Sequence, residues 1–319
     1  MNKVPVIFCF DSHILLGAGV SILSMLDSAA VDTSYEIHIF HPGLEKQLRA
    51  KLQSLVAETH HSMTFYEISP ERFSGMPKGR GSWTEIVYYR LLAAEVLPDC
   101  DKAIYSDVDV FFHCDLVDVF NSDLTGYSWA GVAAEANTPD TTMHRHFPEN
   151  PNDLIFFSGF MVMNLDQMRN EGAVSRYFET IFKFSDRLKF FDLDVLNLAT
   201  NAIFQLPFQY VTLEDVFESD DITHSADYRY LKSAYSIDEL EYARDKPAII
   251  HFAGRRGKPW QRLDMPDYYR EVVLRLPSEL RVGTFRDFRK RWFSAKGRRR
   301  YPKRSVDTRK MLLANKPLL

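Results

Sequence analysis

The sequence predicts an α/β fold in which helices flank a mixed, mainly parallel central sheet. Strand-like and helix-like segments alternate along most of the chain, an order typical of sheets that are covered on both faces. The chain has 319 residues, of which 45% are apolar, so it can bury a full hydrophobic core. Two of the apolar segments end in residues that can bind a metal ion, at the position where sheets of this class commonly bind ligands.

The first half of the chain supplies the regular part of this alternation. The apolar stretch from Ile14 to Leu26 contains glycines and is too short to span a bilayer, so we expect a buried first helix there. Short apolar runs predict the strands, and helical periodicity predicts the helices. The expected strands are Val4–Phe10, Tyr35–His41 and Met63–Ile68, and the expected helices are Gly19–Asp27, Leu44–Glu58 and about Thr84–Val96.

The second half is less regular but continues the pattern. A strand is expected in the run from Tyr105 to Phe112, and further strands at Trp129–Ala134, at Phe156–Asn164 and in the segment that begins at Pro247. One helix is expected from Leu165 to about Phe184.

Two aspartates stand two positions apart in the run from Tyr105 to Phe112. Side chains alternate along an extended segment, so Asp107 and Asp109 are expected to point the same way. Two hard oxygen ligands at the end of a strand suit a divalent cation that binds a diphosphate. An isolated Asp-x-Asp triplet is also typical of a solvated turn, so the hypothesis needs a second signal.

A histidine at the end of a distant apolar segment supplies that signal. The segment Pro247–Gly254 (PAIIHFAG) contains His251, and the sequence RRGKPW follows it. A neutral imidazole beside two carboxylates favours Mn²⁺, with Mg²⁺ as the alternative, because Mg²⁺ prefers oxygen and water ligands. The residues therefore predict a metal site formed by Asp107, Asp109 and His251.

The combination of these motifs resembles glycosyltransferase family 8, and within it the bacterial enzymes that add glucose or galactose to lipopolysaccharide or lipooligosaccharide cores. The resemblance extends from about residue 4 to about residue 275, with the motifs in the expected order. It is carried by DVD at 107–109, HFAG at 251–254, KPW at 258–260, GVSILS at 19–24, YRL at 89–91, Ser158-Gly159 with Asn164-Leu165, and DLDVLN at 192–197.

The resemblance implies a GT-A nucleotide-sugar-binding, Rossmann-like fold for residues 1–280 and a retaining transfer of hexose from a UDP-sugar to a glycan or glycolipid acceptor. It places Asp192 and Lys258 in the catalytic machinery. It assigns the UDP-sugar site to Asp11, Arg90, Asp107, Val108, Asp109, Ser158, Asp192, His251, Gly254 and Lys258.

Simpler roles exist for two of these charged residues. Arg90 is also compatible with a structural ion pair, and Asp192 with the N-cap of a helix. Asp194 is expected to support the start of the same helix. Lys258 is expected to add positive charge beside the departing UDP, and Gly254 or Gly257 to let the backbone approach it closely.

Two residues depart from the family pattern. Phe157 stands where the family often has asparagine, which leaves the donor sugar open between glucose and galactose. Leu193 stands where many relatives have glutamine, and a leucine cannot act as a nucleophile. We therefore expect front-face attack, with a covalent role for Asp192 as the less favoured route.

Two other classes of function fit part of the sequence. Phe157 and Leu193 are compatible with a nucleotide-sugar-binding protein that has lost transfer activity and is recruited to a membrane by its tail. Metal-dependent phosphoryl or nucleotidyl transfer would attack the phosphate chain instead of the glycosidic carbon. The complete Asp107, Asp109 and His251 set favours glycosyl transfer over both.

The C-terminal segment 281–319 differs in composition from the rest of the chain. It contains 14 Lys or Arg and two acids, so the preceding 280 residues carry 25 basic and 41 acidic side chains. Helical spacing places four aromatic residues on one face with basic residues around them, a pattern that favours attachment to an anionic membrane. The aromatic residues are Phe285, Phe288, Trp292 and Phe293.

The composition of this tail is also compatible with packing of its aromatic residues on the protein body and with binding of nucleic acid. Nucleic acid is disfavoured because the acidic body would repel phosphate. The N-terminus lacks a secretion signal, and the odd number of cysteines suits reduced thiols. We therefore expect a cytoplasmic protein that is peripheral on the cytoplasmic face of the inner membrane.

Overall fold

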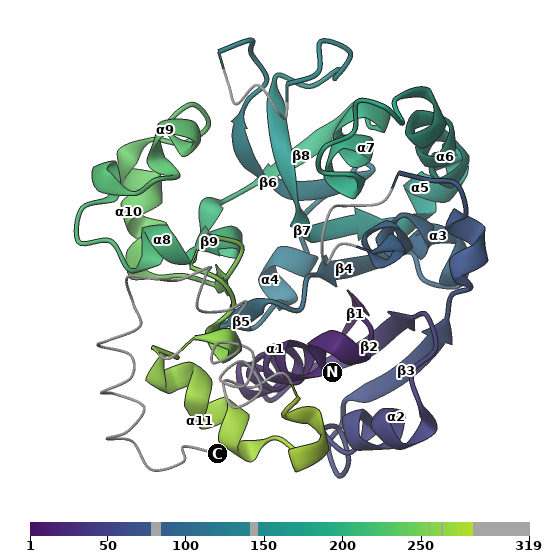
Figure 1. The fold of residues 1–319 in the computed structure, drawn as a ribbon, viewed down its shortest axis with the longest axis vertical. Coiled ribbons are helices and arrows are strands. Elements are labelled where there is room, and N and C mark those ends of the chain that lie inside the picture. The colour runs from purple at the N-terminus through teal and green to yellow at the C-terminus, as the bar shows by residue number, and fades with distance from the viewer. Residues whose placement is uncertain (78–83, 141–145, 255, 263, 283–319) are drawn as a thin grey trace, which may run out of the picture.

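A seven-stranded sheet forms the centre of the fold, and helices pack around it (Figure 1). The structure is a computed structural model that describes residues 1–77, 84–140, 146–254, 256–262 and 264–282. The strand order is β3-β2-β1-β4-β7-β6-β8. The strands are β1 (Asn2–Cys9), β2 (Thr33–His41), β3 (Ser62–Glu67), β4 (Lys102–Ser106), β6 (Trp129–Ala136), β7 (Leu154–Asn164) and β8 (Ile203–Leu206).

Most strand pairs in this sheet are parallel. The pairs β3-β2, β2-β1, β1-β4 and β6-β8 are parallel, whereas β7 is antiparallel to both β4 and β6. The predicted mixed, mainly parallel sheet is therefore confirmed. Because β1 and β4 run side by side with Phe8 opposite Ser106, the residues that follow them, including Asp11 and Asp107, emerge at the same edge of the sheet.

A second sheet of three short strands connects the metal-ligand motifs. Its order is β5-β10-β9, with β10 antiparallel to β5 and parallel to β9. The register places Val110 opposite His251, which joins two segments that are far apart in the sequence. The strands are β5 (Val110–Phe112), β9 (Thr212–Leu213) and β10 (Ile249–His251).

Helices surround the sheets, and several carry the site residues discussed below. The α-helices are α1 (Leu15–Asp27), α2 (Lys46–Gln53), α3 (Ala93–Val96), α4 (Val117–Phe120), α5 (Leu165–Asn170), α6 (Ala173–Lys183), α7 (Asp192–Ala199), α8 (Glu214–Phe217), α9 (Tyr228–Leu231), α10 (Ile237–Asp245) and α11 (Asp267–Arg275). The 3₁₀ helices are η1 (Ser12–Ile14), η2 (Pro70–Phe73), η3 (Glu85–Leu92), η4 (Phe208–Val211), η5 (Ile222–His224), η6 (Pro259–Gln261) and η7 (Ser278–Leu280).

Three of the expected helices were wrong in detail. The segment after Thr84 forms mainly the 3₁₀ helix η3 and only one turn of α-helix, because its run of β-branched and aromatic residues has low helix propensity. The single helix expected from Leu165 is two helices, since Gly172 adopts a left-handed conformation with φ 61° between them. The expected helix Leu44–Glu58 is also shorter, as α2.

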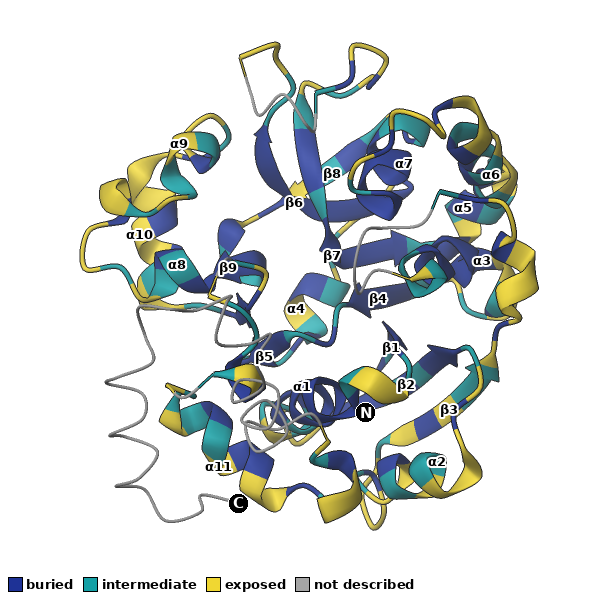
Figure 2. Ribbon diagram, in the orientation of Figure 1, coloured by how far each residue is buried: buried dark blue, intermediate teal, exposed yellow. Residues whose placement is uncertain are grey.

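The core has two clusters of buried apolar side chains. The larger cluster surrounds the central sheet, whose strands are buried along most of their length, and the exposed residues concentrate on outer helices such as α9 and α10 (Figure 2). The smaller cluster joins α1, β10, η6 and α11 through residues that include Leu16, Ile250, Trp260 and Tyr269. It therefore packs the segment after His251 onto the first helix, which is buried as predicted.

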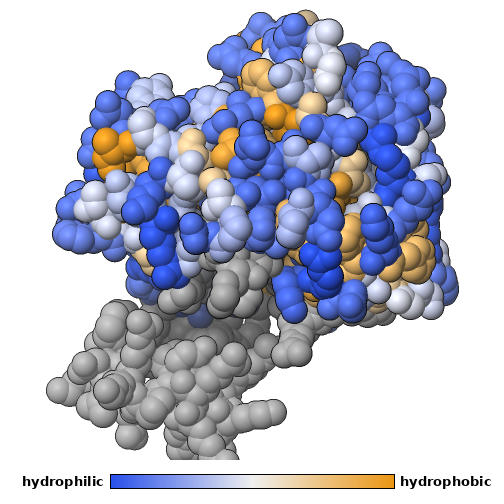
Figure 3. Space-filling view, turned by 90° about the horizontal axis from the view of Figure 1, so that it is seen from above, coloured by the Kyte–Doolittle hydropathy of each residue, from blue (hydrophilic) through white to orange (hydrophobic). Residues whose placement is uncertain are grey.

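The outer surface is mainly polar. On the face seen in Figure 3, hydrophilic residues surround small, separate apolar groups. Among the described residues, no helix has both the length and the apolar character that crossing a membrane requires. The membrane prediction refers to the tail 281–319, of which residues 283–319 lie outside the described residues.

Candidate functional site

Asp107, Asp109 and His251 converge beside the edge of the central sheet. One ligand atom from each residue can be chosen so that all three lie within 4.8 Å of one another. His251 Nε2 lies 3.3 Å from Asp109 Oδ1 and 3.7 Å from Asp107 Oδ2. The structure thus brings together the three residues that the sequence proposed as metal ligands.

The reason for this convergence differs from the expected one. Asp107, Val108 and Asp109 do not continue the strand but form a bent connection between β4 and β5. Strand alternation therefore does not orient the two carboxylates, so the expected reason was wrong although the carboxylates do converge. Instead, the Asp107 N–H donates to the Gly159 carbonyl at 2.8 Å, and the Asp109 carbonyl accepts from the Phe252 N–H at 2.9 Å.

The donor set fits a divalent cation. Asp107 and Asp109 offer carboxylate oxygens, and His251 directs Nε2 toward them while its buried Nδ1 has no hydrogen-bond partner among the described residues. Two carboxylates and one imidazole form a ligand set that Mn²⁺ accepts. Burial opposes ionisation of Asp109, but Lys258 and His251 outweigh it and hold the pKa of Asp109 well below its usual range.

Arg90 contacts this cluster and is almost completely buried. Its Nη2 donates to Asp107 Oδ1 at 2.9 Å, and its Nη1 donates to the Ser158 carbonyl at 2.7 Å. The guanidinium also lies over the Tyr105 ring, 4.1 Å from the centroid, and the Tyr105 hydroxyl donates to the same Asp107 oxygen at 2.7 Å. Arg90 and Tyr105 therefore hold the Asp107 carboxylate in place through its Oδ1 atom.

Asp192 is the second acidic partner of Arg90. Its Oδ2 lies 3.2 Å from Arg90 Nη1, an ion pair without hydrogen-bond geometry. Burial raises the pKa of Asp192 to about 6, although the charge of Arg90 and a hydrogen bond from Ser158 oppose the rise. Asp192 is the first residue of α7, and Phe191 occupies the N-cap position, so the N-cap interpretation was wrong.

Asp194 has a different environment from Asp192, although both are on the first turn of α7. Its Oδ2 accepts from the backbone N–H groups of Lys189 and Phe190, at 2.7 and 2.9 Å. These contacts stabilise the turn that leads into the helix, which confirms the expected supporting role.

Lys258 contacts the cluster from the segment that follows β10. Its Nζ forms an ion pair with Asp109 Oδ2 and donates to the Phe252 carbonyl at 2.9 Å. Gly257, just before it, has φ 80°, which favours glycine. Gly254 lies earlier in the same segment, where the Asp215 carboxylate is 3.9 Å from the position that a Cβ would occupy.

Helix α1 also supports the bent connection, through contacts with its backbone. The Ser21 hydroxyl lies 2.9 Å from the Val108 carbonyl oxygen and 2.8 Å from that of Val110, so its proton is shared between them. A Cβ at Gly17 would lie 2.7 Å from the Trp260 ring and 2.9 Å from the Val108 oxygen. Gly17 therefore permits close contact among α1, Val108 and the Trp260 segment.

Gly159 performs a similar spacing role directly at the cluster. A Cβ at this position would lie 2.6 Å from His251 Cε1 and 2.9 Å from Asp107 Oδ2. The sequence motif Ser158-Gly159 pointed to the segment but not to this steric reason. The supporting roles of Tyr105, Ser21 and Gly17 were also missed, because only the three-dimensional contacts reveal these roles.

Asp11 lies apart from these contacts. It caps η1 by accepting from the His13 N–H at 2.8 Å, and its other oxygen lies 3.2 Å from His13 Nδ1. Among the described residues it forms no ion pair or hydrogen bond with the metal-ligand cluster. Its position after β1 places it at the same edge of the sheet as Asp107.

Comparison with known proteins places these features in a family. The sequence profile described as "Glycosyl transferase family 8" matches residues 5–264. The lipopolysaccharide 1,3-galactosyltransferase of Salmonella typhimurium is 23% identical over 202 residues, which cover 62% of this chain and 59% of that protein. Glycosyltransferase GlyA of Streptococcus pneumoniae is 28% identical over 186 residues, which cover 58% of this chain and 23% of that protein.

Solved structures show the same fold. A galactosyltransferase LgtC structure, in complex with donor and acceptor sugar analogs, has a TM-score of 0.69 at 20% identity and covers 87% of this chain and 99% of that one. The apo structure of the bifunctional glycosyltransferase WbbM also has a TM-score of 0.69, at 21% identity, and covers 92% of this chain and 52% of that one.

The first two curated relatives are matched over about three fifths of their own length, 59% in each case. The family profile, in contrast, matches most of this chain and includes every residue of the cluster, as well as Arg90 and Lys258. The chain belongs to glycosyltransferase family 8 and has the GT-A fold.

Proposed function

We propose that this chain is a retaining α-glycosyltransferase that transfers glucose or galactose from a UDP-sugar to a glycan acceptor. The observation that carries the proposal is the convergence of Asp107, Asp109 and His251 within 4.8 Å. Family membership and the name of the Salmonella relative, a lipopolysaccharide galactosyltransferase, support the choice of hexose and of a lipopolysaccharide-like acceptor.

Asp107, Asp109 and His251 would hold Mn²⁺, or Mg²⁺ as the alternative. When bound, such a cation neutralises negative charge on a departing diphosphate. Lys258 adds a second positive charge at the same place, because its ammonium group already contacts Asp109. Arg90 keeps the Asp107 carboxylate oriented. Gly254 or Gly257 would let the backbone approach the diphosphate closely, and nothing described lies within 4 Å of the Cβ position of Gly257.

The remaining donor contacts are proposed from the positions of their residues. Asp11 would contact the uridine at the edge of the sheet beyond β1, and Val108 and Ser158 would line the donor beside the cluster. Asp192 would bind sugar hydroxyls, since it is held by Arg90 next to Asp107. Leu193 offers no nucleophile, so we favour front-face attack with the UDP oxygen accepting the proton of the incoming hydroxyl.

The metal assignment is tested by replacing Asp109 with alanine. UDP release from UDP-glucose and UDP-galactose, measured with Mn²⁺, should fall to background in Asp109→Ala. The control is Asp118→Ala, which removes an exposed carboxylate from α4. Undiminished UDP release by the Asp109→Ala variant would refute the metal site. If the wild type binds UDP-sugars but releases no UDP, the result would instead support a nucleotide-sugar-binding protein without catalytic activity.

We also propose that residues 281–319 attach the enzyme to the cytoplasmic face of the inner membrane, as a segment separate from the catalytic domain 1–280. The support is the composition of this segment, which contains 14 basic and two acidic residues. Each basic side chain near an anionic membrane contributes about 1 kcal/mol to the free energy of binding. Full-length protein should sediment with phosphatidylglycerol vesicles at low salt, and a chain ending at residue 280 should not. Equal sedimentation of both chains would contradict the proposal.

A further inference from the structure

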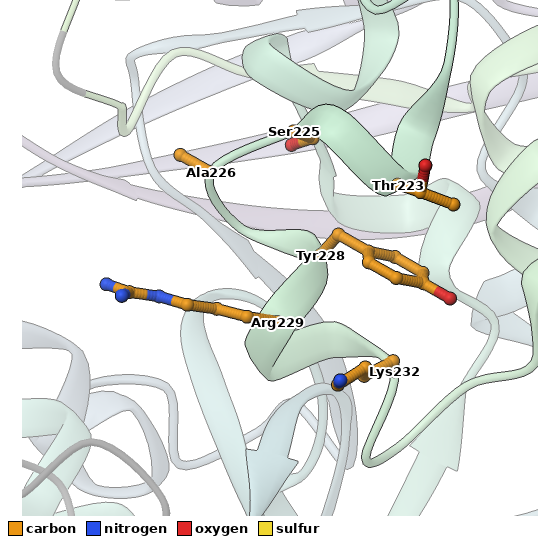
Figure 4. Close-up of a pocket in the computed structure, with 6 residues that line it drawn as sticks. All are labelled: Thr223, Ser225, Ala226, Tyr228, Arg229 and Lys232. Atoms are coloured by element: carbon orange, nitrogen blue, oxygen red, sulfur yellow. The ribbon is translucent and has the colours of Figure 1, made fainter.

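Two adjoining cavities lie beside the segment that follows His251. The larger has a volume of about 530 Å³ and is lined by Thr223, Ser225, Ala226, Tyr228, Arg229 and Lys232 (Figure 4). The smaller has a volume of about 270 Å³ and extends to Ala253 and Gly254. Ala226 and Arg229 line both, so the two cavities adjoin, and the pair is called the depression below. Its smaller part reaches Ala253, two residues from the proposed metal ligand His251.

The larger cavity is cationic although the body of the protein is acidic. Arg229 and Lys232 line it, whereas no carboxylate does. Neither side chain forms an ion pair with a carboxylate of the described residues. Nearby arginines differ in this respect, since Arg244 pairs with Asp245 and Arg256 pairs with Glu218.

The geometry of Arg229 keeps its charge available at the cavity. Its guanidinium lies over the Tyr230 ring, 4.3 Å from the centroid. In Figure 4 the side chain extends away from α9, clear of the other labelled side chains. A planar guanidinium with free N–H groups binds phosphate or carboxylate through paired, charge-assisted hydrogen bonds. Lys232 lines the same cavity and offers an ammonium group as a second donor.

The smaller cavity has the opposite character at its inner end. Two carboxylates, Asp215 and Asp227, line it together with Arg229. Asp215 forms no hydrogen bond or ion pair with another described side chain, and its carboxylate faces Gly254. A carboxylate in this position accepts hydrogen bonds from hydroxyl groups. The depression therefore offers a hydroxyl-binding end near Gly254 and an anion-binding end at Arg229 and Lys232.

We infer that the acceptor is an anionic glycan, whose sugar hydroxyls contact Asp215 and whose phosphate or carboxylate group binds Arg229 and Lys232. This inference rests on the proposed glycosyl transfer, because it places the acceptor beside the segment that carries His251 and Lys258. An anionic group bound away from the reacting hydroxyl would select this class of glycan over neutral ones.

Binding of three sugar probes to the full-length chain tests the inference. Galactose 6-phosphate, galacturonate and galactose are titrated in ligand-observed NMR, so the readout does not depend on turnover. In Arg229→Gln/Lys232→Gln, affinity for one or both anionic probes should fall by about tenfold, and affinity for galactose should not change. Asp215→Asn should weaken all three probes alike.

The control removes the same charges from a distant helix. Lys46→Gln/Arg49→Gln changes α2, which lies far from α9 in Figure 1, and should leave every probe unaffected. If the Arg229→Gln/Lys232→Gln variant loses affinity for galactose 6-phosphate alone, the bound group is a phosphate. If it loses affinity for galacturonate alone, the bound group is a carboxylate. Unchanged affinity for both anionic probes, or an equal loss for galactose, would overturn the inference.

Acceptor-independent UDP release separates this inference from the proposed function. It should be the same in Arg229→Gln/Lys232→Gln and in the wild type, because both side chains lie outside the metal-ligand cluster. Absence of UDP release in the wild type would contradict the proposed function, whereas the probe titrations still decide whether the depression binds anions.

Discussion

Two positively charged side chains of the protein hold the carboxylates of the metal-ligand cluster by ion pairs. Arg90 pairs with Asp107, and Lys258 pairs with Asp109. Burial opposes protonation of Arg90, but Asp192, Tyr105 and Asp107 outweigh it and raise its pKa, so its charge is permanent. The two carboxylates are therefore held in position by side chains of the protein even when no metal ion is bound.

Replacing Lys258 should change metal affinity as well as activity. In Lys258→Met, no ammonium competes for Asp109, so Mn²⁺ should bind in the absence of donor more tightly, on the order of tenfold. UDP release should nevertheless become slower, because the diphosphate loses a positive charge. Isothermal titration with Mn²⁺ measures the first effect, and Lys246→Met, at the exposed end of α10, is the control. Weaker Mn²⁺ binding in Lys258→Met would contradict the competition.

Gly159 sets the spacing between two of the proposed ligands. The methyl group in Gly159→Ala would meet His251 Cε1 and Asp107 Oδ2 at 2.6 and 2.9 Å, so both side chains must move. Mn²⁺ affinity should fall by about 10- to 100-fold, as with other changes that displace metal ligands. Mn²⁺ titration measured by electron paramagnetic resonance reports the loss.

The matched control for this variant is Gly131→Ala, in the neighbouring strand β6. Its methyl group would lie 2.4 Å from the Trp129 ring, away from the cluster. It should lower the melting temperature without changing the Mn²⁺ affinity of the folded protein. Equal Mn²⁺ affinities for Gly159→Ala and the wild type would show that the site adapts to the extra methyl group.

At the scale of elements, the segment from β10 to η6 is fastened to α8 by a buried ion pair. Arg262 donates to both carboxylate oxygens of Glu214, at 2.9 and 2.6 Å, and both side chains are almost completely buried. The smaller apolar cluster holds the other side of this segment against α1 through Trp260. These contacts keep His251 and Lys258 in register with the bent connection after β4.

Breaking this ion pair should destabilise the fold strongly. Arg262→Met leaves Glu214 buried without its partner, so the free energy of unfolding should fall by about 3–5 kcal/mol in urea titrations. The double variant Glu214→Gln/Arg262→Met should recover part of that loss. In contrast, Arg187→Met breaks an exposed pair with Glu149 and should cost less than about 1 kcal/mol. Similar losses for the two arginine variants would contradict the importance of the buried pair.

At the scale of the whole molecule, burial controls the chemistry of the three free cysteines. Cys9 is buried, and Cys100 and Cys114 are partly buried. Burial raises the pKa of all three thiols, to about 11 for Cys114. Folding therefore suppresses thiolate formation throughout the protein.

This shift predicts a loss of stability at alkaline pH. Above about pH 8.5 the thiols of the unfolded chain lose protons that the folded chain retains, so the free energy of unfolding decreases as pH rises. The slope is about 1.4 kcal/mol per pH unit for each thiol that titrates only in the unfolded chain. Urea titrations between about pH 8 and pH 10 should show a shallower slope for Cys9→Ala/Cys100→Ala/Cys114→Ala, and an unchanged slope would refute the attribution.

Much of the molecule was accessible from the sequence because it depends on local patterns. The alternation of apolar runs predicted the class of fold, most of the strands and the buried first helix, but not the helices that follow residue 200. Errors occurred where local signals compete, as at η3 with its aromatic run and at Gly172 between α5 and α6. The ligand types at 107, 109 and 251 were also visible, since side-chain chemistry does not depend on folding.

By itself, the sequence determined which secondary structures form and which side chains are available for metal and diphosphate binding, because propensity and side-chain chemistry are local properties. Only the tertiary structure decided that Val110 pairs with His251, that Lys258 contacts Asp109, and that Asp107 bends away from its strand. Most of these contacts join residues far apart in the chain, and they depend on which strands pair and how the segments pack, which local patterns of residues do not specify.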